Sequence, residues 1–199
     1  METKDFVLGF AAGKAQGGEI KIEYYDYLEF TGQGKIALPF TVNEDYKITV
    51  DFDIPQYRGN NSVIGNSNGA KYVHLTQYSN RYYCSTGSSE TNFSDDLTGR
   101  HTYVVNQNGK TLFDGEEKTN YTPTTNNVFL WVGARADPQP VYFIGKIYSY
   151  KIESIQTGEI LCELKAAKQI YKGKTVLEGF FDTVSGSFYT SANTQVGND

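Results

Sequence analysis

The stretch Tyr46-Lys47-Ile48-Thr49-Val50-Asp51-Phe52-Asp53-Ile54 alternates strictly between apolar and polar side chains from its third residue onward. Successive side chains of an extended chain point to opposite faces, so the alternation separates two faces of one strand. The apolar face carries Ile48, Val50, Phe52 and Ile54, and the polar face carries Lys47, Thr49, Asp51 and Asp53. Such a pattern is typical of a sheet that buries one side only. The stretch predicts a half-buried strand of a sandwich.

Shorter runs of the same kind follow along the chain, separated by turn signals such as Asn106-Gln107-Asn108-Gly109 and Ser185-Gly186. They lie at Tyr82–Ser85, His101–Asn106, Lys110–Phe113, Val128–Ala134, Lys146–Ile152, Glu159–Ala166 and Val176–Phe181. No long amphipathic helix stands between them. The order predicts an all-β, two-sheet antiparallel jelly-roll sandwich rather than a fold of alternating strands and helices.

The run Val128–Ala134 differs because it is apolar at both sets of alternate positions. A strand that is apolar on both faces is expected at the centre of a sheet covered on both sides. We therefore expect Trp131 in the core.

Composition agrees with a single β-rich domain. A chain of 199 residues suffices for one sandwich, and 16 Tyr, 12 Phe and 20 Gly suit strands and tight turns. A chain with a formal charge of -5 does not attract phosphate groups electrostatically, so nucleic acid is not an expected partner.

The first residues follow a different pattern from the rest. In Met1–Gly18, Phe6 and Phe10 recur at helical spacing, and glycines fall at every fourth position from Gly9. We expect residues 1–19 to be either a flexible terminus or a short helical segment that docks onto other subunits or onto copies of the chain, and residues 20–199 to form the sandwich. The segment lacks the basic flank and the length of a signal peptide, and no membrane insertion is expected.

The end of the sandwich has a turn motif with a physical explanation. Asp182 can accept hydrogen bonds from backbone groups two residues on, and Gly186 can adopt a left-handed conformation. The resulting hairpin should return Phe188 and Tyr189 to the core, where we also expect Phe181.

Two stretches resemble a known family. Tyr27-Leu28-Glu29-Phe30-Thr31-Gly32-Gln33-Gly34-Lys35-Ile36 is similar to the opening motif of concanavalin A-like, laminin-G-like domains of phage structural proteins and bacterial surface proteins. Gly179-Phe180-Phe181-Asp182-Thr183-Val184-Ser185-Gly186-Ser187-Phe188-Tyr189-Thr190 resembles their closing motif, although Ala166-Ala167 stands where a Pro-Cys or Pro-Ala pair is common.

The resemblance implies a non-enzymatic surface-binding module. It points to a phage virion component, such as a tail, fibre or capsid decoration, that binds a glycan or a receptor, located on the virion or a bacterial cell surface. The alternative is a purely structural virion or cell-surface protein that makes subunit contacts.

Catalytic chemistry has little support in the sequence. His74 and His101 stand alone, and no nucleophile or metal motif is present. Cys84 and Cys162 are expected as buried thiols without a disulfide. No cofactor is expected; calcium remains an alternative at the loop carboxylates Asp95-Asp96 and Glu116-Glu117.

Glycoside hydrolysis is the second alternative, because retaining enzymes place two carboxyl groups about 5 Å apart across one bond. Asp51 and Asp53 share a strand face, but Pro55 stands where a third carboxylate of the usual pattern would be. We interpret the pair as a solvated strand face.

Binding is the better supported function. Sugar sites combine exposed aromatic rings with amide or guanidinium groups. Two stretches have that make-up, Gln56–Asn61 and Tyr78–Tyr83, and alternation in the second places Tyr82 and Cys84 on one face and Arg81 and Tyr83 on the other. The candidate ligand contacts are Tyr57, Arg58, Asn60, Tyr78, Arg81 and Tyr83.

Overall fold

The computed structural model describes residues 20–66, 73–86, 89–95, 98–120, 123–136 and 140–199. These residues form antiparallel strands and no helix, so the described part of the chain contains no helix that could span a membrane. The proposed docking segment, residues 1–19, lies outside the described residues, as does Asp96, one of the loop carboxylates considered for calcium.

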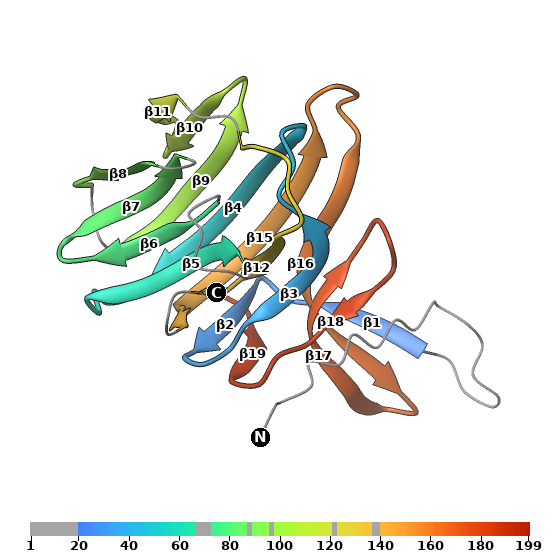
Figure 1. Ribbon diagram of the computed structural model, residues 1–199. Coiled ribbons are helices and arrows are strands. Elements are labelled where there is room, and N and C mark those ends of the chain that lie inside the picture. The colour runs from blue at the N-terminus through green and yellow to red at the C-terminus, as the bar shows by residue number, and fades with distance from the viewer. Residues whose placement is uncertain (1–19, 67–72, 87–88, 96–97, 121–122, 137–139) are drawn as a thin grey trace.

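Two main sheets face each other as the layers of a sandwich (Figure 1). The larger sheet has the order β11 (Glu116–Asn120), β10 (Lys110–Phe113), β9 (Gly99–Gln107), β4 (Tyr46–Ile54), β15 (Ile144–Ser154), β16 (Ile160–Tyr171), β17 (Lys174–Asp182) and β18 (Phe188–Tyr189). It also includes β1 (Ile20–Tyr24) beside β16, β2 (Tyr27–Thr31) beside β15, and β19 (Thr194–Gly197) beside β2.

The smaller sheet has the order β3 (Ile36–Thr41), β12 (Phe129–Val132), β5 (Asn60–Asn66), β6 (Leu75–Tyr78), β7 (Arg81–Thr86) and β8 (Ser89–Phe93). A short ribbon of β13 (Ala134–Arg135) and β14 (Val141–Tyr142) completes the described strands. All pairings are antiparallel, which confirms the predicted all-β sandwich of jelly-roll type.

The core fills the space between the two sheets. The alternation that predicted β4 holds at every position, with Ile48 2% exposed and Val50, Phe52 and Ile54 at 0%. Aromatic rings from both layers meet there: the centroids of Tyr82 on β7 and Phe113 on β10 are 4.7 Å apart. Burying these rings supplies much of the driving force for folding.

The predicted bounds of β4 and β10 are confirmed at both ends. The strand predicted at Glu159–Ala166 is longer, because β16 runs to Tyr171 and turns through Lys172 and Gly173, both at positive φ. This β16–β17 hairpin extends beyond the sandwich, with β1 alongside it (Figure 1).

The turn of the closing motif folds as predicted. The Asp182 carboxylate accepts hydrogen bonds from Val184 N at 3.1 Å and from Ser185 Oγ at 2.6 Å, and Gly186 has a φ of 72°. Phe188 and Tyr189 are both 5% exposed, but only Tyr189 joins the core cluster between the sheets. Phe188 pairs with Phe181 across the β17–β18 ladder and is buried on the outer face, so the core prediction for Phe188 was wrong.

Phe181 is not a core residue either, and the prediction for it was wrong. Its neighbour Phe180 is 0% exposed and faces the core. Phe181 points to the opposite face of β17, where it is partly buried against Tyr24 and Phe188, at ring separations of 6.2 Å and 6.1 Å. The physical reason is that adjacent residues of a strand cannot both point inward.

The placement of Val128–Ala134 was also wrong in part. The run lies in the interior of the smaller sheet, between β3 and β5, but only one of its faces is fully covered. Leu130 and Val132 point inward at 1% and 0% exposure, whereas Phe129 is 49% exposed and Trp131 is half-buried. Trp131 is therefore on the outer face of the sheet and not in the core.

The two thiols agree with the prediction. Cys84 and Cys162 are each 0% exposed, and neither forms a disulfide. Burial, together with the neighbouring Asp182 carboxylate, raises the pKa of the Cys162 thiol well above its ordinary value. The thiol therefore behaves as a small apolar core group.

Candidate functional site

The β6–β7 hairpin positions the residues that the sequence singled out for binding. Its two-residue loop, Ser79-Asn80, has φ values of 48° and 61°, as a type I′ turn requires. Neither residue is glycine, and a left-handed backbone is costly for such residues. This tight turn places Tyr78 directly opposite Arg81 across the hairpin.

The strand alternation predicted for Tyr82–Cys84 is confirmed. Tyr82 and Cys84 are 0% exposed on the inner face, and Arg81 is exposed on the other. On that outer face the rings of Tyr78 and Tyr83 meet edge to face, with centroids 6.0 Å apart. Tyr78 is 53% exposed, so part of its ring faces solvent.

Polar groups surround this pair of rings. The Arg81 guanidinium donates a hydrogen bond from Nη1 to Asn92 Oδ1 on β8 at 2.7 Å, which orients the guanidinium plane. Asn60 on β5 is exposed and lies opposite Tyr78 in the sheet register. Asn92 was missed by the sequence reasoning because no pattern distinguishes it within Ser89–Phe93.

The remaining predicted residues lie in the loop before β5. Tyr57 Oη accepts a hydrogen bond from the Asn80 backbone N at 2.8 Å, so this loop contacts the hairpin turn. Arg58 is exposed next to Tyr57. We call the group Tyr57, Asn60, Tyr78, Arg81, Tyr83 and Asn92 the tyrosine hairpin site.

The tyrosine hairpin site has the chemistry of a binding surface. Tyrosine rings offer flat apolar faces, and the amides and guanidinium offer fixed donors and acceptors at their edges. None of its six residues is a carboxylate or a histidine.

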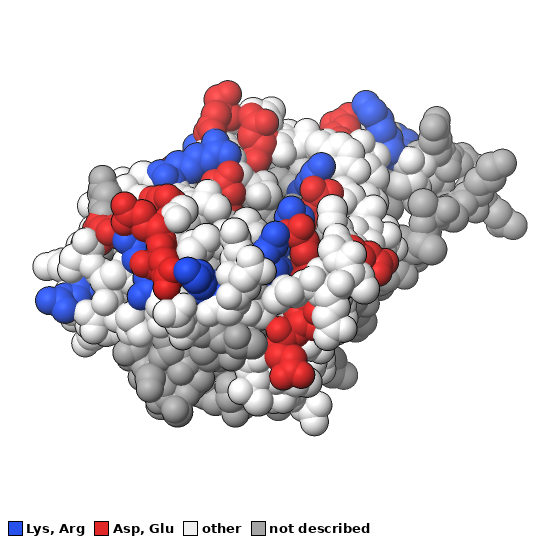
Figure 2. Space-filling model, turned by 90° about the horizontal axis from the view of Figure 1, so that it is seen from above, with Lys and Arg blue, Asp and Glu red and all other residues white. Residues whose placement is uncertain are grey.

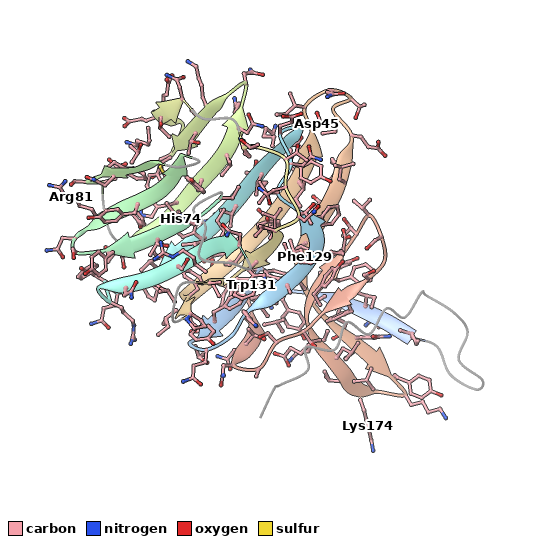
Figure 3. The ribbon with its side chains drawn as sticks, in the orientation of Figure 1. Asp45, His74, Arg81, Phe129, Trp131 and Lys174 are labelled. Carbon is pink, nitrogen blue, oxygen red and sulfur yellow. The ribbon has the colours of Figure 1, made fainter. Side chains whose placement is uncertain are left out.

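A second aromatic surface lies on β12. Phe129 and Trp131 share its outer face, and the Lys35 Nζ lies 4.4 Å from the centroid of the Trp131 ring. Figure 3 labels both rings on β12, away from Arg81. We call Lys35, Phe129 and Trp131 the aromatic platform; the sequence reasoning missed it because an apolar run was interpreted as core.

The polar face of the larger sheet holds the two carboxylates considered for glycoside hydrolysis. Arg100 donates two hydrogen bonds to the Asp51 carboxylate, at 2.9 Å and 2.7 Å, and its guanidinium lies 3.7 Å from the centroid of the Tyr148 ring. Burial and the hydrogen bond that Tyr148 donates to Asp199 raise the pKa of Tyr148 to about 12. Asp51 is therefore half of an ion pair, as on a solvated strand face.

A polar cavity of about 250 Å³ lies at one end of the sandwich, lined by Lys47, Asn106, Gln107, Asn108, Glu153, Ser154, Ile155 and Gly158. Lys47 Nζ and Glu153 Oε2 pair there at 2.8 Å. Figure 2, which looks onto the end of the molecule that is uppermost in Figure 1, shows acidic and basic side chains interleaved. Ligand pockets are usually larger and mostly apolar, so this cavity is the weaker candidate.

The histidines and the loop carboxylates have structural partners. The His101 ring faces Asp114 Oδ2 at 2.7 Å and the Thr98 carbonyl at 3.1 Å, and His74 is 0% exposed. Lys118 Nζ pairs with both Asp95 and Glu116. Within the described ranges, no three His, Cys, Asp or Glu side chains gather in a cluster that could hold a metal ion.

Comparison with known proteins gives one result on the fold. No family model matches the chain, and no curated protein matches its sequence. Among solved structures, the chain is similar to a candidate carbohydrate-binding protein from Bacteroides ovatus, with a TM-score of 0.58. The similarity covers 94% of this chain and 71% of that protein at 12% sequence identity. A likeness at this level of identity shows a shared sandwich fold.

Proposed function

We propose that the chain is a non-enzymatic module that binds a glycan through the tyrosine hairpin site. The observation that carries the proposal is the exposure of the Tyr78 ring, which is 53% exposed and contacts the Tyr83 ring edge to face. The hydrogen bond between Arg81 and Asn92 lies on the same outer face. A pyranose ring has apolar C–H faces and a rim of hydroxyls, which suit an aromatic ring and nearby guanidinium and amide groups. The Bacteroides ovatus protein of similar fold is a candidate carbohydrate-binding protein, which supports the same class of ligand.

The biological setting that we propose is a phage virion or a bacterial cell surface. The support is the resemblance of Tyr27–Ile36 and Gly179–Thr190 to motifs of structural and surface proteins. In that setting the glycan belongs to a receptor on the target cell.

A glycan array with the purified chain, followed by calorimetric titration of the glycans that bind, tests the proposal. We expect Tyr78→Ala to weaken binding about tenfold, the effect of losing ~1.4 kcal/mol of contact free energy. Arg81→Ala should act in the same direction, because the guanidinium donates to ligand hydroxyls.

Tyr24→Ala is the matched control. Tyr24 is also 53% exposed and also has one edge-to-face ring contact, with Phe181, but it lies on β1 far from the hairpin in the fold. An array without a single bound glycan, or equal losses for Tyr78→Ala and Tyr24→Ala, would contradict the proposed site.

Incubation with the bound polysaccharides should release no new reducing ends. A retaining glycosidase needs two carboxyl groups about 5 Å apart that can both reach the glycosidic bond. Here Arg100 occupies both oxygens of Asp51. Reducing-sugar assays provide the measurement, and hydrolysis that disappears in Asp51→Asn or Asp53→Asn would show that the chain is an enzyme.

A further inference from the structure

Two aromatic side chains, Phe129 exposed and Trp131 half-buried, lie on the outer face in the middle of a sheet, where the surface of a sandwich is usually polar. Phe129 and Trp131 are two residues apart on β12, so they stand about 7 Å apart on one face. The intervening Leu130 is 1% exposed on the other face, and Phe129 is 49% exposed. Core packing therefore does not explain why these two positions are aromatic.

The residues paired with Trp131 on the two neighbouring strands are small. Its cross-strand partners are Ala37 on β3 and Gly65 on β5, two of the smallest side chains. On the β5 side the short β13 strand forms a border: a Cβ atom added to Gly65 would lie 2.7 Å from the Arg135 Cα. The chain at Ala134 and Arg135 thus covers the β5 side of Trp131, whereas on β3 its paired residue offers only the methyl group of Ala37, so a planar ligand can approach the Trp131 ring from the β3 side.

Lys35 adds a positive charge to this surface. Its ammonium group lies 4.4 Å from the Trp131 ring centroid, within the range of a cation–π contact. An ammonium group has three N–H donors, so one contact with a protein acceptor still allows another with a ligand. The platform therefore combines two apolar ring faces with a cation at one of them.

We propose that the aromatic platform is a second glycan subsite, selective for uronic acids. The inference rests on the proposed function of glycan binding and assigns a ligand class to a different surface. Consecutive pyranose units pack their C–H faces on Trp131 and Phe129, and the carboxylate of the unit at Trp131 pairs with Lys35. The net charge of -5 does not prevent this, because charges beyond about 8 Å are screened at physiological ionic strength.

The experiment uses Trp131 as its own reporter, since the chain has one tryptophan. The full chain is titrated with galacturonate, mannuronate and glucuronate oligosaccharides and with their methyl esters, which keep the ring and remove the charge. We expect a saturable change in tryptophan fluorescence with at least one acid, and weaker binding of its ester. Lys35→Gln should weaken binding of the acid about fivefold, as for a partly exposed charge pair, and leave the ester unchanged.

Phe129→Ala should weaken both acid and ester, whereas Tyr78→Ala should leave the fluorescence titration unchanged. The inference is overturned if no uronate oligosaccharide changes the fluorescence, if esters bind as tightly as acids, or if Lys35→Gln binds both as the unaltered chain does. Any of these results leaves the Tyr78-dependent binding measured by calorimetry untouched, so the two proposals fail separately.

Discussion

Phe180→Ala should lower the free energy of unfolding by about 3–5 kcal/mol, the usual cost of emptying a buried phenylalanine site. Phe180 is 0% exposed and lies near Phe30, with ring centroids 6.4 Å apart. Removing the ring leaves a cavity between β17 and β2 that the rigid sheets cannot close. Urea denaturation followed by circular dichroism measures the change.

The matched control for this prediction is the neighbouring residue. Phe181→Ala removes the same ring from the partly buried outer face of β17, so its cost should be clearly smaller. If Phe181→Ala destabilises the fold more than Phe180→Ala, the assignment of the two faces of β17 is wrong.

Gly133→Ala should lower the free energy of unfolding by about 2–4 kcal/mol. The substitution overpacks the core and also places alanine in an unfavourable left-handed backbone conformation. Gly133 has a φ of 77° where the chain leaves β12 for β13. A Cβ atom there would lie 2.2 Å from Cε1 of Phe30, a ring that is 0% exposed and has no room to move. The same urea denaturation measures the effect.

Gly115→Ala separates the two contributions to that cost. Gly115 has a similar φ of 81°, but no atom lies within 4 Å of the position of its Cβ. The Gly115→Ala variant should therefore lose only about 1 kcal/mol of unfolding free energy, the cost of a left-handed backbone for alanine. If the two variants lose the same free energy of unfolding, the Phe30 ring moves aside to accommodate the new methyl group. That result would contradict the close packing described between β12 and the core.

The candidate site was partly predictable. Alternation within Arg81–Cys84 correctly separated Arg81 and Tyr83 from Tyr82 and Cys84, but the burial of Tyr82 and Cys84 in the folded chain decided which pair lies on the outer face. The contact between Tyr57 and the Asn80 backbone was not predictable, since the two residues are 23 positions apart and meet only when β5 and β6 pair. Whether these residues bind a sugar stays a prediction.

By itself, the sequence determined the strand period, the fold class and the closing hairpin at Asp182, because these depend on side chains close together in the chain. It could not determine which face of an all-apolar strand points inward. Alternation distinguishes two faces only when they differ in polarity, and in Val128–Ala134 both faces are apolar. The opposing sheet covers Leu130 and Val132, and that tertiary contact alone placed Trp131 and Phe129 outside, where they form the aromatic platform.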